Sequence, residues 1–193
     1  MSLCTREDIA KLDADDPLKG FRNQFELPPG LVYLDGNSLG CLPKSTPDRL
    51  ATVIREEWGR DLIRSWNTAD WINAPRRVGA KIARLIGAAA DEVVTVDSTS
   101  INVFKALNAC LQLSGDRKVL LSERGNFPTD VYMMQGLSML SGGRIETRLV
   151  DGEDVVAALD EDTAALLLTH VHYKTGRMRD MAAITKHAHD KGV

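Results

Sequence analysis

The chain has 193 residues, of which 44% are hydrophobic and 26% are charged, and its net charge is −3. This length and composition predict a globular protein of one domain, or one and a fraction, with a substantial core. The slightly acidic balance argues against a surface for nucleic acid or anionic lipid, and no apolar run approaches the roughly 18 residues of a membrane span. Residues 1–8 hold no apolar signal core, and the three cysteines include no CxxC pair, so we expect a cytoplasmic protein with free thiols.

The first ninety residues predict mainly helices. Residues 9–25 favour one or two short helices, and residues 31–34 a short strand followed by a glycine-flanked turn at 35–40. A helix is expected at 43–58, and a longer one at 70–86 with an apolar stripe and a stop at Gly87. We interpret residues 1–90 as an N-terminal helical segment that carries a substrate-side turn.

After residue 90 the pattern changes to strands and helices in alternation. Strands are predicted at 92–96, 118–122, 144–150 and 164–170, and helices at 101–113, 129–140, 153–159 and 181–190. This alternation is typical of an α/β protein with a mainly parallel sheet covered by helices. The last helix stops at Gly192, and Val193 stands where another strand would begin. We therefore expect residues 91–193 to be the first part of a truncated α/β domain.

Two places in this second part have a strand, then a turn rich in hydroxyl groups, then a helix. The turns are Asp97-Ser98-Thr99-Ser100 and Asn126-Phe127-Pro128-Thr129-Asp130. Ser and Thr often cap helices without any ligand, so neither turn is diagnostic alone. Two helix N-termini aimed at one point, however, make a cup for an anion, because their N–H groups are unpaired and carry partial positive charge. With Phe127 placed to lie flat against an aromatic ring, the pattern suggests a phosphorylated planar cofactor such as pyridoxal 5'-phosphate (PLP).

Five segments of the chain also resemble the kynureninase family, in the order and at the spacing of that family. They are YLDGNSLG at 33–40, LIRSWN at 62–67, STSIN at 98–102, FPTD at 127–130 and HYKTG at 172–176. The resemblance covers essentially the whole chain, but the chain covers less than half of a kynureninase. It implies the large domain of a fold-type I PLP enzyme, similar to class V aminotransferases and usually homodimeric. The implied reaction is hydrolysis of L-kynurenine or 3-hydroxykynurenine to anthranilate or 3-hydroxyanthranilate and L-alanine, in tryptophan catabolism.

The resemblance also assigns roles to individual residues. Phe127 would stack on the cofactor ring, while Thr129 and the backbone near Asp130 would hold its phosphate or ring substituents. The expected cofactor-binding residues are Thr99, Ser100, Phe127, Pro128, Thr129, Asp130 and Thr169. Thr169 ends a predicted strand, where parallel sheets place their ligands, although a β-branched residue also simply suits a strand.

Three residues of the first part are expected on the substrate side of the pocket. Resemblance places Asn37 and Ser38 in the turn at the family's pocket, and Trp66 where substrate selectivity is set. An aromatic wall suits an aryl ketone such as kynurenine. The ordinary interpretations are a glycine-flanked turn for the first two residues and a core position for the tryptophan.

No catalytic residue is expected in the chain itself. Lys174 is not assigned as the Schiff-base lysine, because in kynureninases that lysine lies further along, beyond the segments matched here. The acidic residue for the pyridine nitrogen and the arginine for the substrate carboxylate belong there as well. Lys105 and Lys174 are expected to be solvated, and the chain alone is expected to be inactive.

Other kinds of protein remain open or are disfavoured. His170 and His172 share a strand face, but no third ligand lies at suitable spacing, so we expect no metal. No GxGxxG follows a predicted strand, which disfavours a nucleotide-binding Rossmann domain. The open alternatives are another fold-type I PLP enzyme, similar to cysteine desulfurases, and a non-catalytic fragment that binds a phosphorylated ligand.

Overall fold

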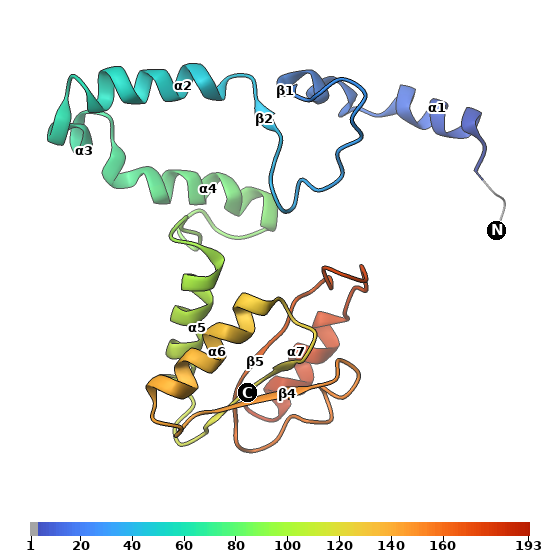
Figure 1. The fold of residues 1–193 in the computed structure, drawn as a ribbon, viewed down its shortest axis with the longest axis vertical. Helices are drawn as coiled ribbons and strands as arrows, with labels where there is room; N and C mark the ends of the chain where they lie inside the picture. Colours follow the sequence, from blue (N-terminus) through green and yellow to red (C-terminus); the bar gives the residue numbers. More distant parts are fainter. Residues whose placement is uncertain (1–3) are drawn as a thin grey trace. The chain divides into compact units, whose positions relative to one another are not determined.

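The computed structural model describes residues 4–193, which divide into two compact units, one up to Val94 and one from Thr95 to Val193 (Figure 1). Residues 1–3 of the N-terminal segment considered for a signal lie outside the described part. The expected division into 1–90 and 91–193, with a functional assignment for each part, stays a prediction. None of the described helices is long and apolar enough to cross a membrane.

The first unit consists of short helices and one small antiparallel ladder. Its α-helices are α1 (Arg6–Asp15), α2 (Thr46–Thr52), α3 (Ser65–Thr68) and α4 (Ala74–Ile86). Short 3-10 turns occur at Lys19–Gln24, Leu62–Arg64 and Trp71–Asn73, and a π-helical turn occurs at Val53–Trp58. The ladder pairs β1 (Phe25–Glu26) with β2 (Leu42–Pro43).

Two predictions for this unit are corrected. The strand expected at 31–34 is wrong, because the strand pair forms instead between the residues on either side of that loop. The helix expected from residue 43 begins at Thr46, since Pro43 belongs to β2. The helix expected at 70–86 is confirmed from Ala74 onward, and it ends as predicted at Gly87, whose φ is 74°.

The second unit contains a three-stranded parallel sheet of order β4-β3-β5. The strands are β3 (Val119–Glu123), β4 (Glu146–Val150) and β5 (Thr163–Leu167). The helices are α5 (Thr99–Leu113), α6 (Pro128–Leu140) and α7 (Met181–Asp190). The predicted α/β fold with a parallel sheet and covering helices is therefore confirmed.

The central strand β3 explains how helices cover both faces of the sheet. Because successive strand side chains point to opposite faces, Leu120 joins one core cluster while Val119 and Leu121 join another. The first cluster contains residues of α5 and α6, namely Leu107, Met134 and Leu137. The second contains Ala188 of α7 and Leu159. The sheet is thus the middle layer of this unit.

Two predicted elements do not form in the second part of the chain. Residues 92–96 are not a strand, and Val94 and Val96 are exposed there. Residues 153–159 form successive turns rather than a helix. Burial of Val155 and Leu159 holds that segment on the unit instead. The strand predicted at 164–170 ends at Leu167.

Candidate functional site

The centre of the candidate site is the buried amide of Asn126, just after β3. Its Nδ2 donates to Ser122 Oγ at 3.1 Å, and its Oδ1 accepts from the Thr169 hydroxyl at 2.7 Å and the Phe127 N–H at 2.8 Å. The side chain is only 4% exposed. Asn126 therefore joins the ends of β3 and β5 to the start of α6, which is the edge of the sheet where α/β proteins place ligands.

The start of α6 presents an exposed aromatic ring and a helix start without a side-chain cap. Phe127 is the N-cap residue, with no side-chain cap, and Pro128 occupies the first turn, where its missing N–H costs nothing. The Phe127 ring is 46% exposed. Thr129 is half-buried in the same turn. Among the described residues, only the Thr129 N–H of this first turn lacks a hydrogen-bond partner, because the Phe127, Asp130 and Val131 N–H groups are bonded and Pro128 has none. An exposed ring beside this donor is suited to a ligand that is both planar and anionic.

Asp130 lies one residue further along this turn. Burial raises the pKa of its carboxyl group above the ordinary value. Its N–H donates to the carbonyl of Phe127 at 3.0 Å, which fixes the first turn of the helix. The residue is half-buried, so its carboxyl group is not fully solvated.

The second expected turn starts α5. Ser98 is the N-cap residue and its Oγ accepts from the Ile101 N–H at 3.4 Å, so the helix begins at Thr99, two residues earlier than predicted. Thr99 is exposed and Ser100 is half-buried. The helices α5 and α6 pack against each other and begin at the same end of the unit (Figure 1). Within residues 4–193 no hydrogen bond links the two turns.

A hairpin that follows β5 adds a second aromatic ring. Val171 pairs with Met178, and the His172 N–H donates to the Arg177 carbonyl at 2.9 Å. The Tyr173 ring meets the Phe127 ring edge-on, with centroids 5.1 Å apart. Tyr173 thus contacts the candidate site at the start of α6.

The two lysines that were expected to be solvated are both exposed. Lys105 forms an ion pair with Asp97, and Lys174 lies 5.4 Å from the centre of the Tyr173 ring. His172, considered above as a metal ligand, uses Nδ1 to accept from the N–H groups of Lys174 and Thr175, at 3.2 and 3.3 Å. This ring therefore orders the hairpin tip.

The expected substrate-side residues all belong to the first unit. Asn37 and Ser38 lie exposed in a turn, where Ser38 Oγ donates to Asp35 Oδ1 at 2.8 Å. The Tyr33 hydroxyl donates to the Leu39 carbonyl at 2.6 Å and so closes this turn. The turn is therefore ordered by its own hydrogen bonds.

Trp66 lies on α3 beside a second tryptophan. The two indole rings meet edge-on, with the Trp66 and Trp71 centroids 6.4 Å apart. Together with Trp58, Leu62 and Ile63 they line a cavity of about 270 Å³. Trp66 is 47% exposed, so it is a cavity wall rather than a core residue.

Trp71 is itself fixed by a hydrogen bond to Glu57, from Nε1 to Oε2 at 2.7 Å. Hydrogen bonds from Arg49 and then from Trp71 hold the pKa of Glu57 below its ordinary value. The carboxylate therefore remains charged and keeps the indole in place, which in turn orients the ring that Trp66 contacts.

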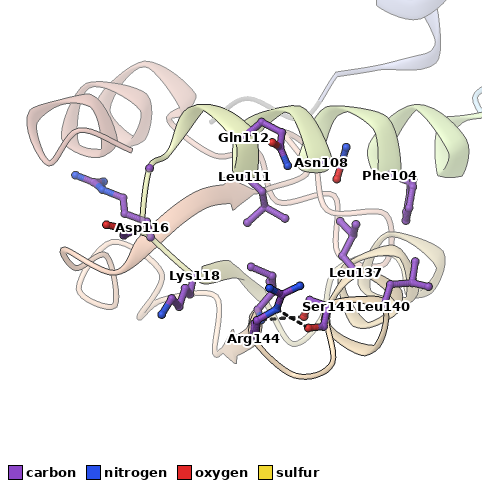
Figure 2. Close-up of a pocket in the computed structure, with 13 residues that line it drawn as sticks. Phe104, Asn108, Leu111, Gln112, Asp116, Lys118, Leu137, Leu140, Ser141 and Arg144 are labelled. Carbon is purple, nitrogen blue, oxygen red and sulfur yellow. Dashed lines mark hydrogen bonds between the residues drawn. The ribbon is translucent and has the colours of Figure 1, made fainter.

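A different cavity, of about 440 Å³, lies in the second unit at the amino ends of the strands, opposite to the Asn126 site (Figure 2). Leu111 of α5 and Leu137 of α6 line it, together with Lys118 and Arg144, which precede β3 and β4. Arg144 Nε donates to the Ser141 carbonyl at 2.9 Å. None of the residues expected to bind cofactor or substrate lines this cavity.

Sequence reasoning did not assign a role to Asn126, Tyr173, Glu123 or Arg179. Asn126 immediately precedes the predicted stacking ring, and an Asn between a strand and a helix often forms local hydrogen bonds, so this residue offered a signal. Tyr173 lies within the HYKTG segment but was not singled out. The contact between Glu123 and Arg179 spans 56 positions and gives no local pattern.

The fold and the site together define an α/β protein whose polar and aromatic groups gather at the carboxyl ends of parallel strands. No family model matches the chain. It is, however, 50% identical over 194 aligned residues to a kynureninase of Burkholderia mallei, covering 98% of this chain and 47% of that protein. Kynureninases of Pseudomonas fluorescens and Deinococcus radiodurans are 49% and 51% identical, over 99% and 96% of this chain and 47% of each relative. The resemblance to kynureninases is confirmed, and the chain spans about half the length of these curated relatives.

Proposed function

We propose that the protein carrying this chain is a PLP-dependent kynureninase. It hydrolyses L-kynurenine or 3-hydroxykynurenine to anthranilate or 3-hydroxyanthranilate and L-alanine. The observation that carries this proposal is the identity of about 50% to kynureninases over 98% of the chain. The tryptophan-catabolic pathway, a cytoplasmic location and a homodimer are parts of the same proposal.

The residues at the carboxyl ends of the strands fit a phosphorylated planar cofactor. Two helices begin on the same side of the second unit, and their first turns carry Thr99, Ser100 and Thr129. Unpaired N–H groups and hydroxyls are the donors that a phosphate accepts best. The Phe127 ring, half-exposed beside them, offers a face for the cofactor ring, since covering it would bury apolar surface.

In this proposal the residues of the chain bind and orient rather than react. PLP supplies an electron sink for the bond changes at the substrate's amino-acid carbon. Thr99, Ser100 and Thr129 hold the phosphate, and Phe127 fixes the tilt of the ring. The Thr169 hydroxyl is held by Asn126, so its oxygen is presented to the site as an acceptor in a fixed position.

The substrate side of the proposal rests on the first unit. Trp66 supplies an aromatic wall for the aryl group of the substrate, and the ordered turn at Asn37 and Ser38 supplies polar contacts. The Schiff-base lysine is proposed to lie in the half of the relatives that this chain does not span. Residues 1–193 alone are therefore expected to hydrolyse no kynurenine.

The phosphate assignment is tested by PLP affinity in the full-length protein that carries these residues. Thr99→Ala and Thr129→Ala should each weaken PLP binding by about 1–3 kcal/mol, the range for a lost hydrogen bond to a charged group. Thr185→Ala is the matched control, because this exposed threonine lies on α7, away from both turns. Unchanged affinity in both test variants would refute the phosphate cup.

A further inference from the structure

A buried ion pair and one hydrogen bond of its arginine connect the end of β3 with the segments that follow β4 and β5. Glu123 is the last residue of β3, and its carboxylate pairs with the Arg179 guanidinium. The two side chains are only 4% and 9% exposed, so this is the most buried ion pair among the described residues. The guanidinium also donates to the carbonyl of Gly152, at 3.1 Å, and Gly152 lies two residues after β4.

Gly152 fits this arrangement because it lacks a side chain. A Cβ at this position would lie 2.6 Å from Glu123 Oε2 and 2.7 Å from Arg179 Nη2. Those atoms have little room to move, because they are buried and bonded to each other. Glu123, Gly152 and Arg179 thus form one packed cluster, which we call the strand-end clamp.

Arg179 also closes the hairpin that carries Tyr173. Its N–H donates to the His170 carbonyl at 2.9 Å, and the pairing of Val171 with Met178 continues the hairpin towards its tip. Tyr173 at the tip meets the Phe127 ring. The base of the hairpin is therefore fixed by the clamp, and its tip contacts the start of α6.

We propose that Glu123 and Arg179 are positioning residues, which hold the 170–179 hairpin so that Tyr173 sets the orientation of Phe127. Phe127 needs such support because its ring is half-exposed and its helix start has no side-chain cap. The role in cofactor binding rests on the proposed function, whereas the anchoring of the hairpin does not. Neither residue contacts the reacting atoms in this account.

The anchoring is tested by hydrogen exchange of the 193-residue chain with Arg179→Met. We expect the hairpin amides of His172 and Gly176 to lose about 100-fold or more of their protection, because the variant leaves Glu123 buried without its partner. Amides of α6 and α7 should change by less than about threefold. The matched control is Arg177→Met, because this exposed arginine of the same hairpin pairs with the exposed Glu153.

Two further measurements separate positioning from simple stability. The nuclear Overhauser contact between the Phe127 and Tyr173 rings should disappear in Arg179→Met and remain in Arg177→Met. Arg179→Lys keeps the charge but has no planar fork to reach both Glu123 and Gly152, so it should lose part of the protection and still fold. In the full-length protein, PLP affinity should fall about two- to tenfold in Arg179→Met, the range of one aromatic contact.

The outcomes distinguish this inference from the proposed function. Equal protection of the hairpin in Arg179→Met and Arg177→Met would overturn the clamp, as would a ring contact that survives in Arg179→Met. If Arg179→Met does not fold, wild-type protection and ring contact in Arg179→Lys would overturn it. A wild-type full-length protein that binds no PLP, together with a hairpin that opens in Arg179→Met, would refute cofactor binding and support the clamp.

Discussion

Replacement of Asn126 by alanine should destabilise the second unit, because it removes three hydrogen bonds at once. The amide bonds to Ser122, Thr169 and the Phe127 N–H, and its side chain is 4% exposed. A typical net contribution is about 0.5–1.5 kcal/mol for each hydrogen bond. Water can reach the half-buried Thr169 and replace part of its lost hydrogen bond. We therefore expect the free energy of unfolding to fall by about 2–3 kcal/mol, a large part of the 5–15 kcal/mol that a typical domain has.

The assay is urea unfolding followed by far-ultraviolet circular dichroism. All three tryptophans of the chain lie in the first unit, so tryptophan fluorescence would not report on this site. With an m-value of about 2 kcal/mol/M, the midpoint should fall by about 1 M at unchanged m. Asn108→Ala is the control, because Asn108 is exposed on α5 and its loss should cost less than about 0.5 kcal/mol.

A double-mutant cycle isolates the bond to Thr169. Thr169→Val keeps the shape of the side chain and removes its hydroxyl, so the effects of Thr169→Val and Asn126→Ala should not add. Additive effects, or an Asn126→Ala variant as stable as Asn108→Ala, would refute the assignment of Asn126 as the link between β3, β5 and α6.

Two other variants test the packing and the electrostatics of the two units. Gly79→Ala should destabilise α4 by about 1–3 kcal/mol, because the new Cβ would collide with the Val93 carbonyl. Gly136→Ala on α6 should instead stabilise by about 0.5–1 kcal/mol, because its new Cβ meets open space. Equal melting temperatures of the two variants would contradict this contrast. Burial raises the pKa of Asp130 above about 3.8, so the folded state binds this proton more tightly than the unfolded state. The free energy of unfolding therefore falls as the pH rises through the raised pKa of Asp130. Asp130→Asn should be more stable than wild type at pH 7 but not at pH 3, and urea unfolding at both pH values checks the sign.

The elements with strong local signals were predicted closely. The α6 prediction began one residue late, because Pro128 starts the helix and Phe127 precedes it with extended backbone. The α5 prediction began two residues late, because Ser98 rather than Ser100 caps the helix. Apolar runs bounded by turn residues identified β3, β4 and most of β5. In each case the information lies within a few consecutive residues.

The incorrect predictions depend on partners distant in the sequence. Residues 31–34 and 92–96 have strand-like composition, but a strand needs a neighbour, and neither segment has one in the described chain. The same limit applies to the site. Phe127 and Thr169 were predicted separately, but their connection through Asn126 appears only when β3 and β5 pair. The strand-end clamp likewise requires the folded sheet.

The measurement that tests the account most directly is anthranilate release from L-kynurenine by the full-length protein that carries residues 1–193. The account predicts anthranilate fluorescence that requires added PLP after dialysis and that falls in Thr129→Ala at limiting PLP. Residues 1–193 alone should release none. PLP-dependent activity on another amino acid with no anthranilate from kynurenine would contradict the kynureninase assignment, and anthranilate release that is independent of PLP would contradict the cofactor site.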